Sequence, residues 1–192
     1  MWNRTENQIN VQIALIRHGK TASNREHRYL GRTDEGLDAD GKQELLNYKE
    51  EGRYPAVDVL FVSPMKRCKE TAEILYPGML YLEIPEWREM DFGEFEGKNY
   101  MELSGDPRYQ EWIDSNGILP FPGGESREEF ICRCVQGYEK MEKNSRSLTI
   151  GCIVHGGTIM ALLSHYLGGE YFDYQIPNGG IYMWVPSGPS VR

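Results

Sequence analysis

The chain has 192 residues, of which 40% are hydrophobic, and a formal net charge of −8 at pH 7. This length fits one domain over residues 1–192 that can bury a core. The acidic balance disfavours nucleic acid and anionic membranes as partners. Residues 1–8 contain no apolar signal segment, and no run in the chain is long enough to span a bilayer. Four cysteines without metal-binding spacing favour reduced thiols, so we expect a cytoplasmic protein.

Short apolar, β-branched runs predict four buried strands, at residues 11–16, 57–62, 149–154 and 181–185. Helical patterns predict helices over 40–51, 65–76 and 158–167 and one that begins near 126. Ser126 and Glu129 form a capping-box pair at the start of that helix. The alternation of strands and helices predicts a three-layer α/β/α fold with a mostly parallel central sheet. Residues 186–190 are expected to form a loose tail.

Residues 92–126 interrupt this alternation and are rich in glycine, proline and aromatic residues. We interpret them as a small cap insertion that folds over the carboxyl end of the sheet. Tyr100, Tyr109, Trp112 and Phe121 belong to this segment. Their rings either stack on a flat substrate group or pack the cap onto the sheet.

The first strand is followed by an unusual combination of polar residues, in which Arg17 and His18 come directly after the apolar run. The ends of strands are where α/β sheets usually expose their chemistry. An arginine beside a histidine suggests an anion held by a guanidinium group, next to a ring nitrogen that attacks it or moves protons. The alternative is a basic turn in which His18 only caps or packs. Of the basic residues between 17 and 32, we assign only Arg17 to a site.

Two further junctions carry candidate residues. Arg67 lies in the first turn of the helix over 65–76, where the helix dipole does not favour a cation. Two partners could stabilise an arginine at this position: a bound anion, or Glu70 on the same helix face. His155 and Gly156 follow the third strand, where backbone amides can approach a bound group. A buried structural histidine is the alternative there.

Residues 87–97 form an acidic block, and composition does not indicate which carboxylate acts. Residues 36–43 nearly spell a phosphate-binding P-loop. They place Gln43 where a magnesium-binding hydroxyl belongs and include two aspartates, so we reject that interpretation. The chain has no G-x-S-x-G elbow and no H-E-x-x-H pair, which disfavours a serine esterase and a metal hydrolase. We predict no metal and no cofactor.

Four motifs occur in order along the chain. They are L-x-R-H-G-x-T-x-x-N at residues 15–24, S-P-x-x-R-x-x-x-T-A at 63–72, E-x-D-F-G-x-x-E-G at 89–97 and H-G-G at 155–157. Together they resemble the histidine phosphatase superfamily, also called phosphoglycerate mutase-like. Residues 89–93 and 122–126 resemble its α-ribazole phosphatase branch, which serves cobalamin biosynthesis. The chain departs from the usual pattern at Lys20 and at residues 36–38, which leaves the surrounding substrate contacts open.

The resemblance implies a metal-independent phosphoric monoester hydrolase with His18 as its nucleophile. His18 would form a phosphohistidine that water then hydrolyses, which splits one difficult step into two easier ones. Glu89 would protonate the leaving oxygen, for which its pKa must be raised.

The phosphate itself would be held by side chains and one backbone amide. The resemblance implies contributions from Arg17, Arg67, a protonated or hydrogen-bonding His155, Asn24 and Gly156. Positive charge and hydrogen bonds of this kind stabilise the oxygens of a phosphoryl group during its transfer.

The expected substrate is a small phosphate ester, either α-ribazole 5′-phosphate or a broad range of such esters. One alternative function is a phosphoglycerate mutase, although the chain is short between the acidic block and His155 for a mutase of this family. The other is a phospho-ligand binding module without turnover, which the presence of both His18 and Glu89 disfavours. The sequence does not indicate an oligomeric state.

Overall fold

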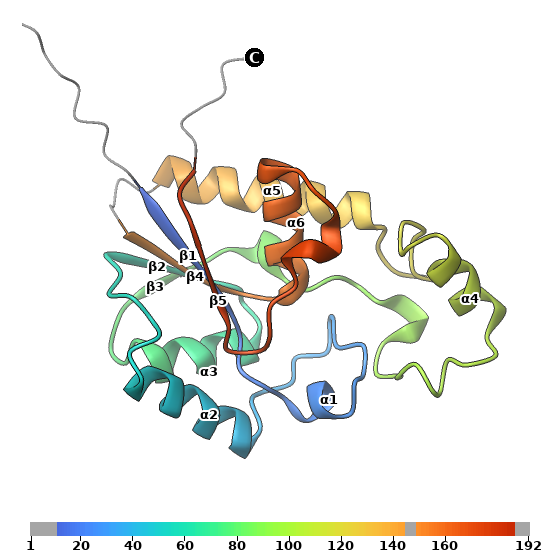
Figure 1. The fold of residues 1–192 in the computed structure, drawn as a ribbon, viewed down its shortest axis with the longest axis horizontal. Helices are drawn as coiled ribbons and strands as arrows, with labels where there is room; N and C mark the ends of the chain where they lie inside the picture. The colour runs from blue at the N-terminus through green and yellow to red at the C-terminus, as the bar shows by residue number, and fades with distance from the viewer. Residues whose placement is uncertain (1–10, 145–148, 187–192) are drawn as a thin grey trace, which may run out of the picture.

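The computed structural model describes residues 11–144 and 149–186, so residues 1–8 and nearly all of the expected tail at 186–190 lie outside the described part (Figure 1). Its centre is a five-stranded sheet in the order β3-β2-β4-β1-β5. The strands are β1 (Gln12–Arg17), β2 (Val59–Val62), β3 (Tyr81–Glu83), β4 (Thr149–Val154) and β5 (Ile181–Trp184). All neighbouring pairs are parallel except β1 and β5, which confirms the mostly parallel sheet.

Helices cover both faces of the sheet, with α2 and α3 on one side and α5 and α6 on the other (Figure 1). The helices are α1 (Ala22–Arg25), α2 (Ala39–Glu50), α3 (Lys66–Leu75), α4 (Pro107–Asp114), α5 (Arg127–Asn144) and α6 (Gly156–Leu167). The predicted three-layer α/β/α fold is confirmed. Asp38, inside the P-loop-like stretch, accepts a hydrogen bond from the Gly41 amide and so caps α2.

The side chains of β1 alternate between the two layers of helices. Ile13 and Leu15 pack in the cluster formed with α5 and α6, whereas Ala14 and Ile16 pack with α2 and α3. All four side chains are buried. A strand with both faces covered reads as a continuous apolar run, which is why the sequence pattern identified it.

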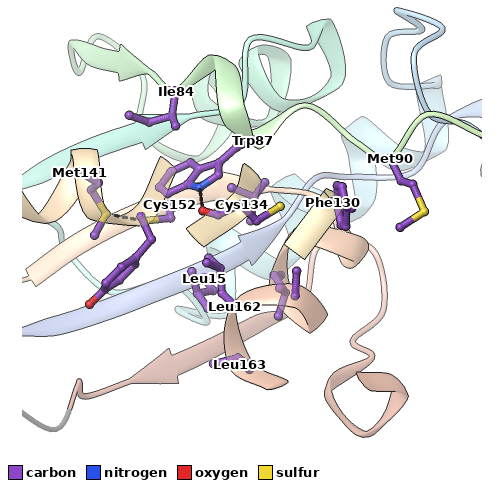
Figure 2. Close-up of a cluster of buried hydrophobic side chains, with 14 of the residues drawn as sticks. Leu15, Ile84, Trp87, Met90, Phe130, Cys134, Met141, Cys152, Leu162 and Leu163 are labelled. Carbon is purple, nitrogen blue, oxygen red and sulfur yellow. Dashed lines mark hydrogen bonds between the residues drawn. The ribbon is translucent and has the colours of Figure 1, made fainter. Parts of the chain in front are cut away.

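Trp87 anchors the segment that leads to the acidic block. Its indole nitrogen donates to the Cys134 carbonyl of α5 at 3.2 Å, inside the core shown in Figure 2. Gly137, one turn further along α5, makes room for the ring, because a Cβ there would lie 2.6 Å from the Trp87 Nε1 atom. A glycine inside a helix costs about 1 kcal/mol relative to alanine, and here it permits close packing. The backbone two residues before Glu89 is therefore fixed from the helix layer.

The segment 92–126 contains the 3₁₀ turn η2 (Gly93–Phe95) and helix α4, which the sequence pattern did not indicate. Asp106 caps α4, and Pro107 opens it. Phe95, Leu103 and Phe121 belong to the same apolar cluster as the α5 and α6 face of the sheet. The organisation as one domain with a cap over about 92–126 remains a prediction, which this shared cluster favours.

Within the described residues, no helix has the length and apolar character needed to cross a membrane. The cytoplasmic location stays a prediction.

Candidate active site

The predicted histidines meet because their strands are neighbours. Arg17, the last residue of β1, pairs in register with Val154, the last residue of β4. His18 and His155 are the next residues of the two strands, and their rings lie edge to face with centroids 5.2 Å apart. Ser63 follows β2 on the other side of β4. Three of the four motifs thus converge at the carboxyl edge of the sheet.

His18 is held as a neutral ring with one nitrogen available. Its Nδ1 lies 2.7 Å from the Gly19 carbonyl oxygen, which can only accept, so Nδ1 carries the proton. Burial, together with the charges of Arg67 and Arg17, holds the pKa of His18 well below its ordinary value. The lone pair is therefore on Nε2, and the ring lines a cavity although only 3% of the residue is exposed.

Arg17 lines the cavity and has one buried donor without a partner among the described residues. Its Nη1 donates to the Ile176 carbonyl at 2.7 Å, while its buried Nε finds no acceptor within the described residues. Gly156, the first residue of α6, packs against this guanidinium, since a Cβ at 156 would lie 3.2 Å from the Arg17 Nε and Cζ atoms. A helix N-terminus and a free guanidinium donor together favour an anion at this point.

His155 is also neutral, and both of its ring nitrogens have protein partners. Arg67 Nε donates to Nδ1 at 3.3 Å, so the ring proton is on Nε2, which lies 2.8 Å from the Ser63 hydroxyl oxygen. Burial is the first cause that holds the pKa of His155 well below its ordinary value, followed by the charges of Arg67 and His18. The sequence left open whether His155 is protonated or a neutral hydrogen-bonding ring, and these contacts correspond to the neutral hydrogen-bonding ring.

Arg67 is fully buried behind His155 and does not line the cavity. Its other donors reach the carbonyls of Thr33 and Gly31, each at 3.0 Å. The expected alternative, a pair with Glu70, is wrong: Glu70 accepts from the Leu37 amide at 2.9 Å instead. Arg67 thus connects the loop around residue 31 to His155, and its positive charge lies on the side of His155 away from the cavity.

Glu89 faces the same cavity and is 9% exposed. Its Oε1 accepts from the Met90 amide at 2.9 Å and packs against Gly157, where a side chain would clash with it. Burial raises the pKa of Glu89 above its ordinary value, against the opposing influence of that amide and of the two arginines. A carboxyl group in this environment can hold a proton closer to neutral pH.

Arg133 of α5 braces the backbone around Glu89, a role that the sequence did not indicate. It donates to the carbonyls of Glu86 at 2.6 Å, Arg88 at 2.8 Å and Glu89 at 3.4 Å. Two further hydrogen bonds, at 2.9 and 2.7 Å, join it to both oxygens of Glu125. The planar guanidinium group suits such a set of acceptors. Its position on a helix 44 residues downstream of Glu89 leaves no local signal for this role.

Asn24 lines the cavity with its amide oriented by two donors. Its Oδ1 accepts from the Thr21 amide at 3.2 Å and from Asn178 Nδ2 at 3.1 Å, which leaves its own Nδ2 available. Asn178 also donates to the His18 carbonyl at 3.2 Å, and the Gly179 amide donates to that same oxygen at 3.1 Å. The loop before β5 therefore holds the end of β1, a contact between residues too far apart in sequence for a motif to indicate.

The other basic residues between 17 and 32 are paired with carboxylates, in agreement with the assignment of Arg17 alone. The pairs are Lys20 with Glu44, Arg25 with Asp38 and Asp40, Arg28 with Glu26 and Glu102, and Arg32 with Asp91.

The cavity has a volume of about 560 Å³ and extends from His18 to an aromatic wall. Trp112 and Phe121 of the predicted aromatic set line it, with ring centroids 4.8 Å apart. Tyr100 and Tyr109 lie along a second hollow instead, so their proposed stacking on a substrate in this cavity is wrong. Among the described residues, no three His, Cys, Asp or Glu side chains are grouped so that they could hold a metal ion.

The site brings two neutral histidines, two arginines and the N-terminus of α6 together at the carboxyl edge of a three-layer α/β fold, an arrangement that suits a bound anion. The model of the histidine phosphatase superfamily (branch 1) matches residues 13–187. The chain therefore belongs to the histidine phosphatase superfamily.

Relatives within the family carry different names. The uncharacterized phosphatase PhoE of Bacillus subtilis is 31% identical over 160 residues, which cover 82% of this chain and 78% of the relative. The solved phosphoglycerate mutase of Thermus thermophilus has a TM-score of 0.71 at 32% identity, over 90% of this chain and 92% of the other. The α-ribazole phosphatase of Shigella flexneri has a TM-score of 0.80 over 90% and 89% of the two chains. At 22% sequence identity, this structural likeness shows a shared fold alone.

Proposed function

We propose that this protein is a phosphomonoester hydrolase in which His18 forms a phosphohistidine intermediate. The observation that carries the proposal is the position of the His18 ring. Its Nδ1 lies 2.7 Å from the Gly19 carbonyl oxygen, which assigns the proton to Nδ1 and the lone pair to Nε2, and His18 lines the cavity together with Arg17. A neutral imidazole is a nucleophile, and the adjacent guanidinium group attracts the phosphate that it attacks.

In the first step, His18 Nε2 forms a bond to phosphorus while the bond from phosphorus to the ester oxygen breaks. Glu89 transfers its proton to the departing oxygen and becomes a carboxylate. The phosphohistidine retains its proton on Nδ1, and the Gly19 carbonyl stabilises the positive charge of the ring.

In the second step, water attacks phosphorus and the bond to Nε2 breaks. The Glu89 carboxylate accepts the proton of that water, so the cycle ends with the same protonation states with which it began. Inorganic phosphate is the product, and the neutral His18 is restored.

The positive charge for both steps comes from the protein. Arg17 and Asn24 are assigned to the phosphate oxygens directly, and the N-terminal amide of Gly156 completes the group. Arg67 contributes charge from beneath, and His155 is the neutral ring that joins it to Ser63 and packs against His18. With these groups supplying the charge, the proposed cycle includes no metal ion.

For the substrate, we propose α-ribazole 5′-phosphate or a broad range of small phosphate esters. The aromatic wall of Trp112 and Phe121 supports a leaving group with a flat or apolar part. The fold shared with an α-ribazole phosphatase is consistent with the first possibility.

A phosphate-release panel tests the proposal. It contains α-ribazole 5′-phosphate, two phosphoglycerates, sugar phosphates and 4-nitrophenyl phosphate, with His18→Ala as the control. We expect the unmodified protein to release phosphate from at least one ester and to form an acid-labile phosphoprotein. Isomerisation of 3-phosphoglycerate without net release would instead indicate a mutase, which the similarity to a phosphoglycerate mutase keeps as the second candidate. Tight binding without either reaction would indicate a binding module.

A further inference from the structure

Arg127, the first residue of α5, lines the same cavity as His18. Its guanidinium carbon lies 4.7 Å from the ring centroid of Tyr171 and 5.0 Å from that of Phe172. Its Nη2 donates to the Asn116 carbonyl in the cap. Two aromatic faces and one carbonyl therefore fix the position of this cation in the cavity wall.

Arg127, like Arg17, differs in its partners from the other two Lys and Arg side chains that line the cavity. Lys20 is paired with Glu44 at 3.0 Å, and Arg28 is paired with Glu26 and Glu102, both at 2.6 Å. In the part of the chain that the structure describes, no carboxylate forms an ion pair with Arg127. Glu170 is near enough to favour its charge but not to bond to it. A partly desolvated guanidinium without a counter-ion gains from an anion that enters the cavity.

Aromatic rings form part of the wall of the cavity that Arg127 and His18 line. Phe92 and Phe121 lie edge to face at 5.0 Å, and Tyr29 lies 5.8 Å from Phe121. These rings line the same cavity as both cations, and its volume of about 560 Å³ exceeds what a phosphate group fills. The cavity therefore combines the guanidinium groups of Arg17 and Arg127 with an apolar wall.

We propose that Arg127 binds a second anionic group on the leaving group, so that the preferred substrates are phosphate monoesters with a flat or apolar body and an acid group away from the reacting phosphate. This inference rests on the proposed hydrolase function. It selects the second of the two substrate proposals, small phosphate esters, because α-ribazole 5′-phosphate has no acid group besides its phosphate. A carboxylate and a second phosphate share the chemistry that a guanidinium group recognises.

Three matched aryl esters test the inference: 4-carboxyphenyl phosphate, 4-carbamoylphenyl phosphate and 1,4-phenylene bisphosphate. The carboxylate and the amide have nearly the same shape, so their ratio of kcat/KM isolates the charge. We expect roughly a tenfold to hundredfold preference for the carboxylate, the range of a charge-assisted hydrogen bond. The bisphosphate shows whether a second phosphate is preferred over the carboxylate.

In Arg127→Gln the preference should fall toward one, and Arg127→Lys should restore part of it. Arg108→Gln is the matched control, because Arg108 is an exposed cap arginine paired with Glu94 and Asp106 outside the cavity. It should retain the full preference. A ratio near one in the unmodified protein, or one that Arg127→Gln leaves intact, overturns the inference.

Calorimetry with His18→Ala separates this inference from the proposed function. If the protein hydrolyses the esters without preferring the acid, the hydrolase proposal stands and the inference fails. If no ester is hydrolysed, the dissociation constants of the carboxylate and amide esters still decide the inference. Tighter binding of the carboxylate supports it, and equal binding overturns it.

Discussion

The two ends of the cavity are built from different kinds of structure. At the proposed phosphate end, Arg17 ends a buried strand and His18 follows it, and backbone groups determine their orientation. At the leaving-group end, Trp112 and Arg127 come from the cap and from the start of α5, and side chains from distant segments surround them. The chemistry is thus encoded in short motifs, whereas the choice of substrate depends on which loops pack together. The following predictions test that division, beginning with the largest expected effect.

Replacement of the nucleophile should stop turnover of every substrate. His18→Ala is expected to lower kcat/KM on the order of 10⁴-fold or more for alkyl and aryl esters alike, because the covalent route is lost. Steady-state phosphate release measures the loss, and circular dichroism checks that the fold is retained. His165→Ala is the matched control, since His165 is exposed on α6. Substantial activity in His18→Ala would show that His18 is not the nucleophile.

Replacement of the acid should affect poor leaving groups most. Glu89→Gln is expected to lower kcat/KM about 10²- to 10⁴-fold for an alkyl phosphate and much less for 4-nitrophenyl phosphate, whose leaving group needs no proton. Glu94→Gln, an exposed carboxylate in the same segment, should leave both rates unchanged. Equal losses for the two esters would contradict the assignment of Glu89 as the acid.

The pH dependence follows from the directions of the two pKa shifts. His18 must be neutral, and burial lowers its pKa, so this requirement is met even in mildly acidic solution. Glu89 must be protonated, and burial raises its pKa, so its active form is lost only as pH rises through that raised value. Alkyl phosphate hydrolysis should therefore be fastest at acidic pH and decline toward alkaline pH. The kcat/KM profile of Glu89→Gln should lack this decline, and an unchanged decline would refute its assignment to Glu89.

Loss of the Arg133 contacts around Glu89 should also affect poor leaving groups more than good ones. The effect should be smaller than that of replacing Glu89 itself. Arg133→Gln removes the donors to three carbonyls around Glu89, so we expect about a tenfold loss of kcat/KM for an alkyl phosphate. The loss for 4-nitrophenyl phosphate should be smaller, and Arg133→Lys should recover part of the activity. Arg53→Gln, on an exposed arginine, is the control. A loss that is equal for both esters would indicate only a general structural role.

The loop before β5 should influence the phosphate end alone. Asn178→Ala removes the amide that donates to Asn24 and to the His18 carbonyl. We expect inorganic phosphate to bind several-fold more weakly, as for the loss of about one hydrogen bond. Competitive inhibition by phosphate measures the change, and Asn47→Ala on the surface of α2 is the control. A change in the preference between alkyl and aryl esters would contradict the idea that this loop influences only the phosphate end.

Much of the fold was predictable because its strands are buried on both sides and its helices carry end signals. The capping box at Ser126 and Glu129 is present, and Gly52, just after α2, has a positive φ of 71°, a conformation that glycine adopts readily at helix ends. β3 has only three residues, of which two are exposed, and the sequence analysis did not predict it although residues 79–82 are apolar. The antiparallel direction of β5 depends on the path of the preceding loop, which periodicity does not encode.

The candidate site also contains residues that the sequence predicted and residues that it did not. His18, Arg17, Glu89 and Asn24 were expected, and all four line the cavity. Arg67 and His155 were expected as well, but the structure places them behind the wall, where they bond to each other. Asn178, Arg133 and Arg127 were missed, because each acts through a contact with a segment far away in sequence.

The contact between residues 176–179 and the end of β1 also has a consequence for biosynthesis. Arg17 and His18 are oriented by the Ile176 carbonyl and the Gly179 amide, which come after the last of the four motifs in the chain. During synthesis, we therefore expect the site to be completed only when residues 176–179 can pack against the end of β1.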